Sequence, residues 1–213
     1  MPHTTRTTTL RWIAVAVISA LVVTLIGGVW LYRGQERTLR AQAENELETI
    51  AELKSAEIAR WRSERLADAH RLAAAPGARE LVIDWLAEPS AEHLKPVVQT
   101  LQSLRHDDRY ADVLLVSPEG EMLVAASGDA IELQPDALES LREALASGEP
   151  VFSELHLDQF GESPHLDVLT PISASDQPGA QAVAAVLLRV NADQFLFPLI
   201  QTWPTPSETA ETL

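Results

Sequence analysis

The stretch WIAVAVISALVVTLIGGVWLY, residues 12–32, is 21 residues long, carries no formal charge and is bounded by Arg11 and Arg33. A helix needs about 20 apolar residues to cross the roughly 30 Å hydrocarbon core of a bilayer. Aromatic residues lie at both ends of the stretch, where their rings prefer the membrane interface. It therefore predicts one transmembrane helix over residues 12–32, with a cleaved signal peptide as the alternative.

Basic residues flank this helix on both sides, with Arg6 and Arg11 before it and Arg33, Arg37 and Arg40 after it. The positive-inside count is nearly balanced and does not set the orientation by itself. The preceding segment is short, however, and a long following domain can be translocated largely regardless of its charge. We therefore expect residues 1–11 in the cytoplasm and the rest of the chain on the other side of the membrane.

The charge balance excludes several classes of partner. The whole chain has a formal net charge of −15. The first 33 residues hold three arginines and no acid, which leaves 13 basic against 31 acidic residues, or −18, in the remainder. This part repels nucleic acid and anionic lipid. The chain has no cysteine, so it has no disulfide, no thiolate nucleophile and no cysteine-ligated metal.

Residues 35–75 contain no proline or glycine and are rich in helix formers, which predicts a long helix that continues from the membrane segment. Its apolar face repeats with spacings of 4, 4 and 3, and this eleven-residue period keeps the face nearly straight. Lys54 and Arg65 interrupt the face. We therefore expect a helix that leans on a globular body and meets a second copy near the membrane, giving a homodimer.

The pattern changes after Pro76 and Gly77, which we expect to end the long helix. Two shorter helices are predicted at 78–87 and 91–105, and a further helix at 136–147. Five strands are predicted at 111–117, 121–127, 150–158, 165–173 and 181–190, with a hairpin turn at 118–120. Residues 183–188 are apolar on both alternating sets, as in a central strand covered on both faces. The order predicts an α+β fold with an antiparallel five-stranded sheet and flanking helices.

This order, together with three segments, resembles the Cache domains, which are extracytoplasmic PAS-like sensor modules of bacterial membrane receptors such as sensor histidine kinases and diguanylate cyclases. The segments are IARWRSERLADA (58–69), PHLDV (164–168) and FPLIQTWPTPS (197–207). The resemblance implies a PAS-like sensor lobe over residues 76–200. It also implies a place in the bacterial inner membrane, which residues 1–213 cross once, with the soluble domain in the periplasm.

Such receptors usually carry two lobes, a second membrane helix and a cytoplasmic output domain. This chain ends at Leu213 after one lobe, and residues 201–213 read as a linker or as the start of a second lobe. The resemblance therefore implies the first lobe of a double module, in a fragment or truncated product. Kinase or cyclase activity would lie in a domain outside these residues.

A repeated tripeptide gives the sharpest local pattern, His156-Leu157-Asp158 and His165-Leu166-Asp167, on either side of a turn. If residue 158 pairs with 165 and 156 with 167, all four polar side chains lie on one face of the sheet. The functional interpretations are a cationic-ligand site, a pH-sensitive site or a divalent metal site. The alternative is a solvated set of cross-strand contacts, which we favour over metal. We thus predict ligand contacts at His156, His165 and Asp167, and no metal or other cofactor.

Other ligand candidates are Arg109 and Tyr110 before the first strand, and Arg189 on the predicted central strand. A charge on a strand buried on both faces is costly unless it is paired, faces a wet cavity or reaches the solvent. Asp112 and Thr170 are weaker candidates, chosen only by their positions on strands. Arg62 and Arg65 beside Trp61 could clamp a carboxylate, but helical pairs such as Arg60–Glu64 and Arg65–Asp68 explain them better.

No enzyme signature is found in the sequence: it has no glycine-rich phosphate loop, no H-E-x-x-H and no G-x-S-x-G. We therefore predict a non-enzymatic sensor region that binds a small molecule such as an organic acid or an amino acid. A non-catalytic envelope scaffold that dimerises through the long helix is the second hypothesis, and a periplasmic hydrolase is the third.

Overall fold

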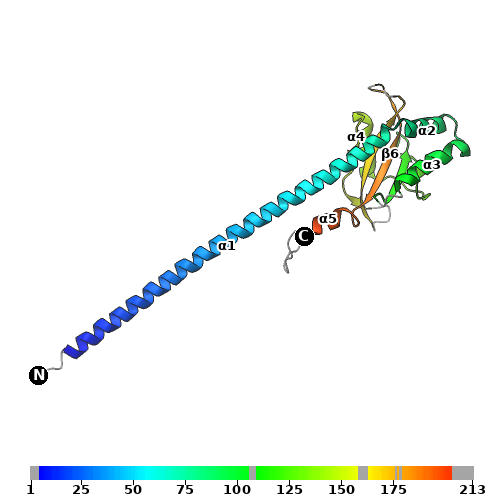
Figure 1. The fold of residues 1–213 in the computed structure, drawn as a ribbon. Helices are drawn as coiled ribbons and strands as arrows, with labels where there is room; N and C mark the ends of the chain where they lie inside the picture. Colours follow the sequence, from blue (N-terminus) through cyan, green and yellow to red (C-terminus); the bar gives the residue numbers. More distant parts are fainter. Residues whose placement is uncertain (1–4, 106–108, 158–162, 176, 178, 203–213) are drawn as a thin grey trace. The chain divides into compact units, whose positions relative to one another are not determined.

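The computed structural model describes residues 5–105, 109–157, 163–175, 177 and 179–202, and their side chains from residue 16 onward, except at Pro76. The predictions for Asp158 and for the tail 203–213 fall outside these residues. The chain divides into two compact units, 1–53 and 54–213, with the boundary inside helix α1 (Thr5–Ala73). Each unit is described by itself below (Figure 1).

The first unit is the N-terminal part of α1, and it contains the apolar stretch quoted above. This part of the helix is long and apolar enough to cross a membrane, and none of its apolar window is buried. Gly27, Gly28 and Gly34 do not interrupt the helix. The predicted segments 12–32 and 35–75 thus belong to one helix, and the membrane span itself remains a prediction.

The second unit begins with the last residues of α1 and has an α+β fold. Its further elements are α2 (Pro76–Ala87), α3 (Ala91–Arg105), β1 (Asp112–Val116), β2 (Met122–Ala125), α4 (Pro135–Ser147), β3 (Val151–Phe152), β4 (His156–Leu157), β5 (Pro164–Ser173), β6 (Ala182–Asn191) and α5 (Leu196–Gln201). The strands form one antiparallel sheet in the order β2-β1-β6-β5-β3, with β4 also paired to β5. This confirms the predicted PAS-like fold. The sheet has six strands because the predicted strand 150–158 is divided into β3 and β4.

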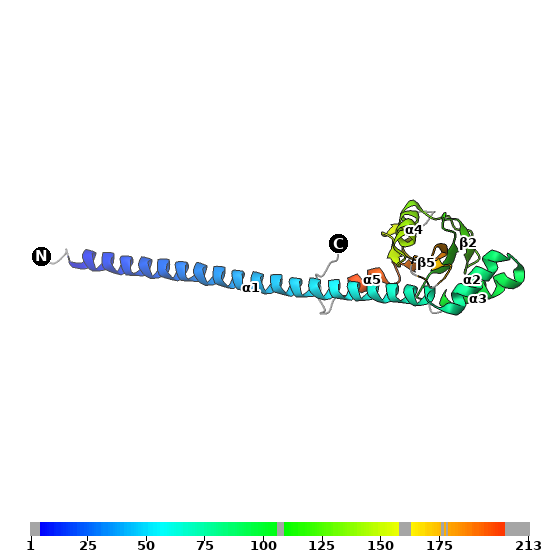
Figure 2. The ribbon, with the colours of Figure 1, turned by 90° about the horizontal axis from the view of Figure 1, so that it is seen from above.

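Two apolar cores lie on the two faces of this sheet. On β6, Val186 and Leu188 belong to the core shared with α1, α2 and α3, whereas Leu187 and Ala185 belong to the core under α4. Figure 2 shows α4 and the α2–α3 pair on different sides of the sheet. Strand β6 is therefore central and covered on both faces, as its uniformly apolar sequence predicted.

The C-terminal part of α1 packs on the domain as expected, since Trp61, Leu66 and Leu72 contact the first of these cores. Both polar interruptions of the helix face have partners. The Lys54 amine donates a hydrogen bond to the carbonyl oxygen of Leu199 at 2.9 Å. Arg65 pairs with Asp68 at 3.4 Å, so neither charge is left uncompensated against the domain.

Several boundaries differ from the prediction for backbone reasons. Helix α1 ends at Ala73 and α2 begins at Pro76, because a proline in the first turn has no helical hydrogen bond to lose. Pro96 lies inside α3, which begins at Ala91 and tolerates one missing bond. The short helix α5 was not predicted. The hairpin turn is confirmed at Gly120, whose φ is +91° and whose added Cβ would clash with the Leu138 side chain.

Candidate functional site

The six predicted ligand residues fall into two polar clusters. Arg109 and Tyr110 belong to what we call the arginine cluster, made with three residues of α1, namely Arg65, Asp68 and Arg71. The other four, His156, His165, Asp167 and Arg189, form what we call the histidine cluster. The two clusters lie on different faces of the sheet, so the predicted residues do not make one site.

In the arginine cluster, one carboxylate faces several guanidinium groups. Asp68 Oδ2 lies 3.4 Å from Arg65 Nη2 and 3.6 Å from Arg109 Nη1. Arg71 donates a short hydrogen bond to the other oxygen, Oδ1. Among the described residues, positive charge therefore exceeds negative charge here, and the neighbouring Asp107 and Asp108 lie outside them.

Tyr110 forms the wall of this cluster on the sheet side. Its hydroxyl donates a long hydrogen bond of 3.4 Å to Asp68 Oδ2, and the Arg65 guanidinium lies 5.6 Å from the centre of its ring. Burial raises the pKa of the Tyr110 phenol above its ordinary value, with Asp68 acting in the same direction and Arg65 against it. The phenol is therefore held neutral and is available as a hydrogen-bond donor.

A cavity of about 290 Å³ opens between these residues. Its polar lining comes from Asp68, Arg71, Arg109 and Tyr110, and its apolar lining from Leu72, Leu104 and Leu188. This volume is near the lower end of the range of small-molecule sites, which combine apolar walls with a few converging polar groups. A metabolite of amino-acid size with a carboxylate matches the volume of the cavity and the guanidinium groups that line it.

A larger cavity, of about 740 Å³, lies at the end of the sheet where β5 joins β6. Its charged lining residues are His70, Arg79 and Glu149. His70 and Glu149 are 3.8 Å apart, with side chains 63% and 71% exposed, so this pair is a solvated surface contact. We therefore place the candidate small-molecule site at the arginine cluster.

The histidine cluster lies on the face of the sheet that α4 covers. Strand β4 pairs with β5 so that His156 lies opposite His165, and Arg189 on β6 lies opposite Asp167. The predicted pairing of 156 with 167 is wrong by two residues. A shift of two keeps every side chain on its face, so the predicted gathering of His156, His165 and Asp167 on one face is confirmed.

Asp167 is completely buried and holds Arg189 through two hydrogen bonds. Arg189 donates from Nε to Oδ1 and from Nη2 to Oδ2, each at 3.0 Å. This bidentate geometry is the strongest arrangement for a guanidinium and a carboxylate. It resolves the alternatives considered for Arg189, because the charge is paired and its side chain is only 11% exposed.

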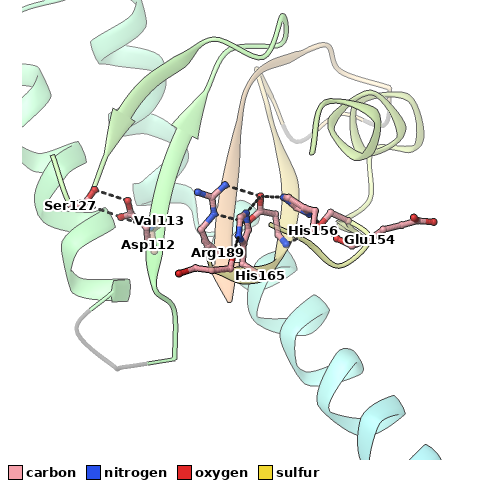
Figure 3. A network of polar contacts seen from close by, with 10 residues as sticks. Asp112, Val113, Ser127, Glu154, His156, His165 and Arg189 are labelled. Carbon is pink, nitrogen blue, oxygen red and sulfur yellow. Dashed lines mark hydrogen bonds and ion pairs between the residues drawn. The ribbon is translucent and has the colours of Figure 1, made fainter. Parts of the chain in front are cut away.

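The two imidazole rings lie against each other, with ring centres 4.2 Å apart. Figure 3 shows His156, His165 and Arg189 gathered in one network of polar contacts. Each Nδ1 contacts a backbone carbonyl, that of Glu154 at 2.8 Å for His156 and that of Ser163 at 3.0 Å for His165. Their Nε2 atoms lie 3.4 and 3.8 Å from Asp167 Oδ2. Both Nε2 atoms are buried without a hydrogen bond. The expected alternative of solvated contacts is therefore wrong.

The environment moves the pKa values of the three groups apart. Contact with Asp167 raises the pKa of His156 despite its burial, whereas burial lowers the pKa of His165 despite the same carboxylate. Burial by itself raises the pKa of Asp167, but His156 and Arg189 together hold it below its ordinary value. The carboxylate is therefore ionised and faces one ring that gains a proton more readily than the other.

The weaker candidates have structural partners. Asp112 lies opposite Arg189 on β1 and accepts hydrogen bonds from the Ser127 hydroxyl at 2.6 Å and the Ser127 backbone N–H at 3.0 Å. Thr170 is buried in β5. Arg62 stacks 5.0 Å above the ring of Phe152 instead of clamping a carboxylate, and the helical pair Arg60–Glu64 is confirmed at 3.0 Å.

Sequence reasoning missed two residues that organise these clusters. Asp68 was recognised only as a helical partner of Arg65, and its contacts with Arg109 and Tyr110 come from distant parts of the sequence. Ser153 was not considered, yet its hydroxyl accepts the backbone N–H of Asp167 at 2.8 Å. The signal for Ser153 was a small polar residue inside a predicted strand, three positions before His156.

The fold is that of bacterial sensor domains. The sensor domain of the histidine kinase DctB from Vibrio cholerae matches with a TM-score of 0.53 and 13% identity over 74% of this chain. The ligand-binding domain of the chemoreceptor PctC from Pseudomonas aeruginosa, solved with GABA, matches with a TM-score of 0.52 and 19% identity over 75% of this chain. The ligand-binding domain of the chemoreceptor CtaA from Pseudomonas fluorescens, solved with L-isoleucine, matches with a TM-score of 0.54 and 15% identity over 78% of this chain.

These likenesses establish the fold and confirm the resemblance to extracytoplasmic sensor modules at that level. The chain spans 57%, 65% and 63% of the lengths of these three domains. No protein-family profile matches the sequence, and no curated protein matches it either.

Proposed function

We propose that this chain is the sensory input region of a bacterial membrane receptor and that it recognises a small organic acid or an amino acid outside the cytoplasm. The observation that carries the proposal is the fold shared with sensor domains of histidine kinases and chemoreceptors. The role is non-enzymatic, and any kinase or cyclase activity belongs to a domain outside residues 1–213.

The ligand enters the cavity of the arginine cluster. Its carboxylate accepts hydrogen bonds from Arg71 and Arg109, which recognise carboxylates better than lysine does. An ammonium group, where present, faces the carboxylate of Asp68. The Tyr110 phenol supplies a further hydrogen bond, and the leucine side chains of the cavity hold the carbon skeleton.

Signal transfer starts at α1, because the ligand contacts residues of this helix directly. Asp68, Arg71 and Leu72 line the cavity from α1, and Arg109 and Tyr110 line it from the segment before β1. A ligand transmits a signal only when it binds one arrangement of the two walls better than another. Ligand-dependent displacement of α1 against β1 is the change that we propose.

The chain is a homodimer anchored in the inner membrane by residues 12–32, with the second unit in the periplasm. Large apolar side chains of α1 that follow the apolar stretch remain exposed in the single chain, including Leu39, Leu47 and Leu53. Burying them against a second copy removes apolar surface from water. A reporter fused after residue 202 tests the topology, and activity of a cytoplasmic reporter there would contradict the proposal. Retention in the membrane fraction separates an anchor from a cleaved signal peptide.

Ligand binding is tested by thermal unfolding of the full chain in detergent micelles, with chelator present, against a library of amino acids and small carboxylic acids. We expect at least one carboxylate to raise the midpoint for wild type and not for Arg109→Gln. Arg142→Gln is the matched control, because Arg142 is exposed on α4. A library without any effect on wild type, together with self-association through α1, would favour the scaffold hypothesis.

A further inference from the structure

The two histidines of the histidine cluster point unpaired nitrogen atoms at the same carboxylate oxygen. His156 is 9% exposed and His165 is 3% exposed, and in both rings Nε2 has no hydrogen bond. Leaving one such buried polar atom unsatisfied costs the free energy of its lost hydration. Two unsatisfied nitrogen atoms directed at one oxygen of the completely buried Asp167 are not explained by packing alone.

The hydrogen bonds of the rings fix which nitrogen carries the proton. A backbone carbonyl only accepts hydrogen bonds, so Nδ1 of His156 and Nδ1 of His165 are the protonated atoms. In the neutral rings, both Nε2 atoms then present lone pairs. These lone pairs face Asp167 Oδ2, which also presents lone pairs, and the three groups repel one another unless a cation lies between them.

We propose that His156, His165 and Asp167 bind a divalent transition-metal ion of the zinc type. A proton satisfies only one of the two rings, and two protons place two imidazolium ions with ring centres 4.2 Å apart. A single metal ion accepts a lone pair from both rings and from Oδ2 at once. It therefore removes all of the repulsions and leaves the Nδ1 hydrogen bonds in place.

The distances suit such an ion. Zinc binds imidazole nitrogen and carboxylate oxygen at about 2.0–2.2 Å, so the ligand atoms of a tetrahedral site lie about 3.4 Å apart. The distances to Asp167 Oδ2 are 3.4 Å from His156 Nε2 and 3.8 Å from His165 Nε2. One ligand atom from each of the three residues lies within 4.8 Å of the other two. The His165 Nε2 distance to Asp167 Oδ2 exceeds the ideal spacing by a few tenths of an ångström.

The surroundings supply an outer shell. Metal-bound histidines usually donate their second N–H to a backbone carbonyl or a carboxylate, and both rings do so here. Arg189 fixes the orientation of the Asp167 carboxylate through both of its oxygens. Asp112 lies opposite Arg189 on the neighbouring strand β1. The remaining coordination position is left for water or an anion.

Two nitrogen donors favour zinc, nickel or cobalt over magnesium or calcium, which prefer oxygen. This site lies on the other face of the sheet from the arginine cluster, and it does not depend on the small-molecule proposal. From the sequence, solvated contacts were favoured over metal because the strand register was only assumed. The register and the burial of all three residues are the observations that reverse this preference.

The test uses the full chain in detergent micelles after removal of metal by chelator. Either Zn²⁺ or Co²⁺ is added as the only transition metal, in the presence of excess Mg²⁺. The metal that stays bound to the protein is measured after gel filtration. The visible spectrum of bound Co²⁺ reports nitrogen ligands and coordination number. The variants are His156→Gln and His165→Gln, with His93→Gln as the matched control, because His93 also has Nδ1 on a backbone carbonyl but is only half-buried and lies outside the cluster.

We expect wild type and His93→Gln to retain one equivalent of Zn²⁺, to give a four-coordinate Co²⁺ spectrum and to unfold at a higher temperature with Zn²⁺. Each site variant should lose more affinity than the roughly 10- to 100-fold typical of outer-shell changes. Wild type without stoichiometric Zn²⁺, or site variants that bind as wild type does, would overturn the proposal. The wild-type titration decides the question even where a variant fails to fold. Carboxylate binding is measured with chelator present, so its result does not depend on whether the metal site exists.

Discussion

The arginine cluster and the histidine cluster each gather basic side chains around one aspartate, but they do so in opposite environments. Asp68 keeps 18% of its side chain exposed, lines a cavity and is surrounded by guanidinium groups that reach into it. Asp167 is completely buried, its two oxygens are held by one arginine, and the unpaired atoms belong to the neighbouring imidazoles. The first arrangement suits an exchangeable organic anion, and the second suits an enclosed cation.

The largest difference should appear in stability. Asp167→Asn breaks the buried bidentate ion pair with Arg189, and breaking a buried ion pair in this way costs about 3–5 kcal/mol. Asp68→Asn should cost about 1 kcal/mol or less, because partly exposed pairs contribute little. Urea unfolding of both variants in the presence of chelator, followed by tryptophan fluorescence, measures the two losses. Equal losses would show that the two environments do not differ as described.

Substitutions in the arginine cluster should reduce the affinity for a carboxylate ligand more than substitutions in the histidine cluster do. Arg71→Gln removes a charged hydrogen bond to the carboxylate ligand, worth about 1.5–3 kcal/mol or about 10- to 100-fold in affinity. His165→Gln should leave this affinity unchanged, because His165 lies on the other face of the sheet. Calorimetry with the carboxylate that most raises the thermal midpoint compares the two variants. A larger loss from His165→Gln would move the small-molecule site to the histidine cluster.

Ser153→Ala tests how the histidine cluster is held in register. The Ser153 hydroxyl accepts the backbone N–H of Asp167 and donates to the carbonyl of Glu154 at 2.9 Å. Without it, the buried N–H has no partner, and we expect a loss of about 1–2 kcal/mol. Hydrogen exchange at the Asp167 amide should accelerate, while exchange in α1 stays as in wild type. Unchanged exchange at Asp167 would mean that this hydroxyl does not hold the strand.

The smallest effect concerns alkaline pH. The pKa of Tyr110 is raised in the folded chain above the ordinary value of 10.0, so folding binds this proton more tightly than the unfolded chain does. The resulting stability is complete below pH 10 and is lost as the pH rises above it. Between about pH 9 and 11 the unfolding midpoint of wild type should fall more steeply than that of Tyr110→Phe. Parallel curves would show that the phenol is not shielded.

The fold could be read from the sequence where one local rule dominated. The span 91–105 was predicted with the boundaries observed for α3, and the uniformly apolar run 183–188 gave the central strand. The predicted strand 150–158 is divided between β3 and β4, where Asp167 N–H bonds the Ser153 hydroxyl instead of a backbone carbonyl. Phe152 pairs with Val168 before this break, and His156 pairs with His165 after it. The register therefore changes by one residue, and no local sequence pattern predicts this change.

The candidate sites were predictable as residue types but not as groupings. The repeated tripeptide indicated that histidine and aspartate share one face, and this held because the register error was an even number of residues. The burial of this face depends on how α4 and the loops cover the sheet, which the sequence does not show. Arg109 and Tyr110 were chosen by position alone, and their partner Asp68 lies 42 residues away from Tyr110 on α1.

Hydrogen–deuterium exchange of the full chain, with the carboxylate ligand or with Zn²⁺, tests most directly the claim that the two clusters bind different ligands. The account predicts that the carboxylate slows exchange in peptides covering residues 65–72 of α1 and leaves 153–157 unchanged, and that Zn²⁺ does the reverse. Protection of the same peptide by both ligands, or of neither peptide by either one, would contradict it.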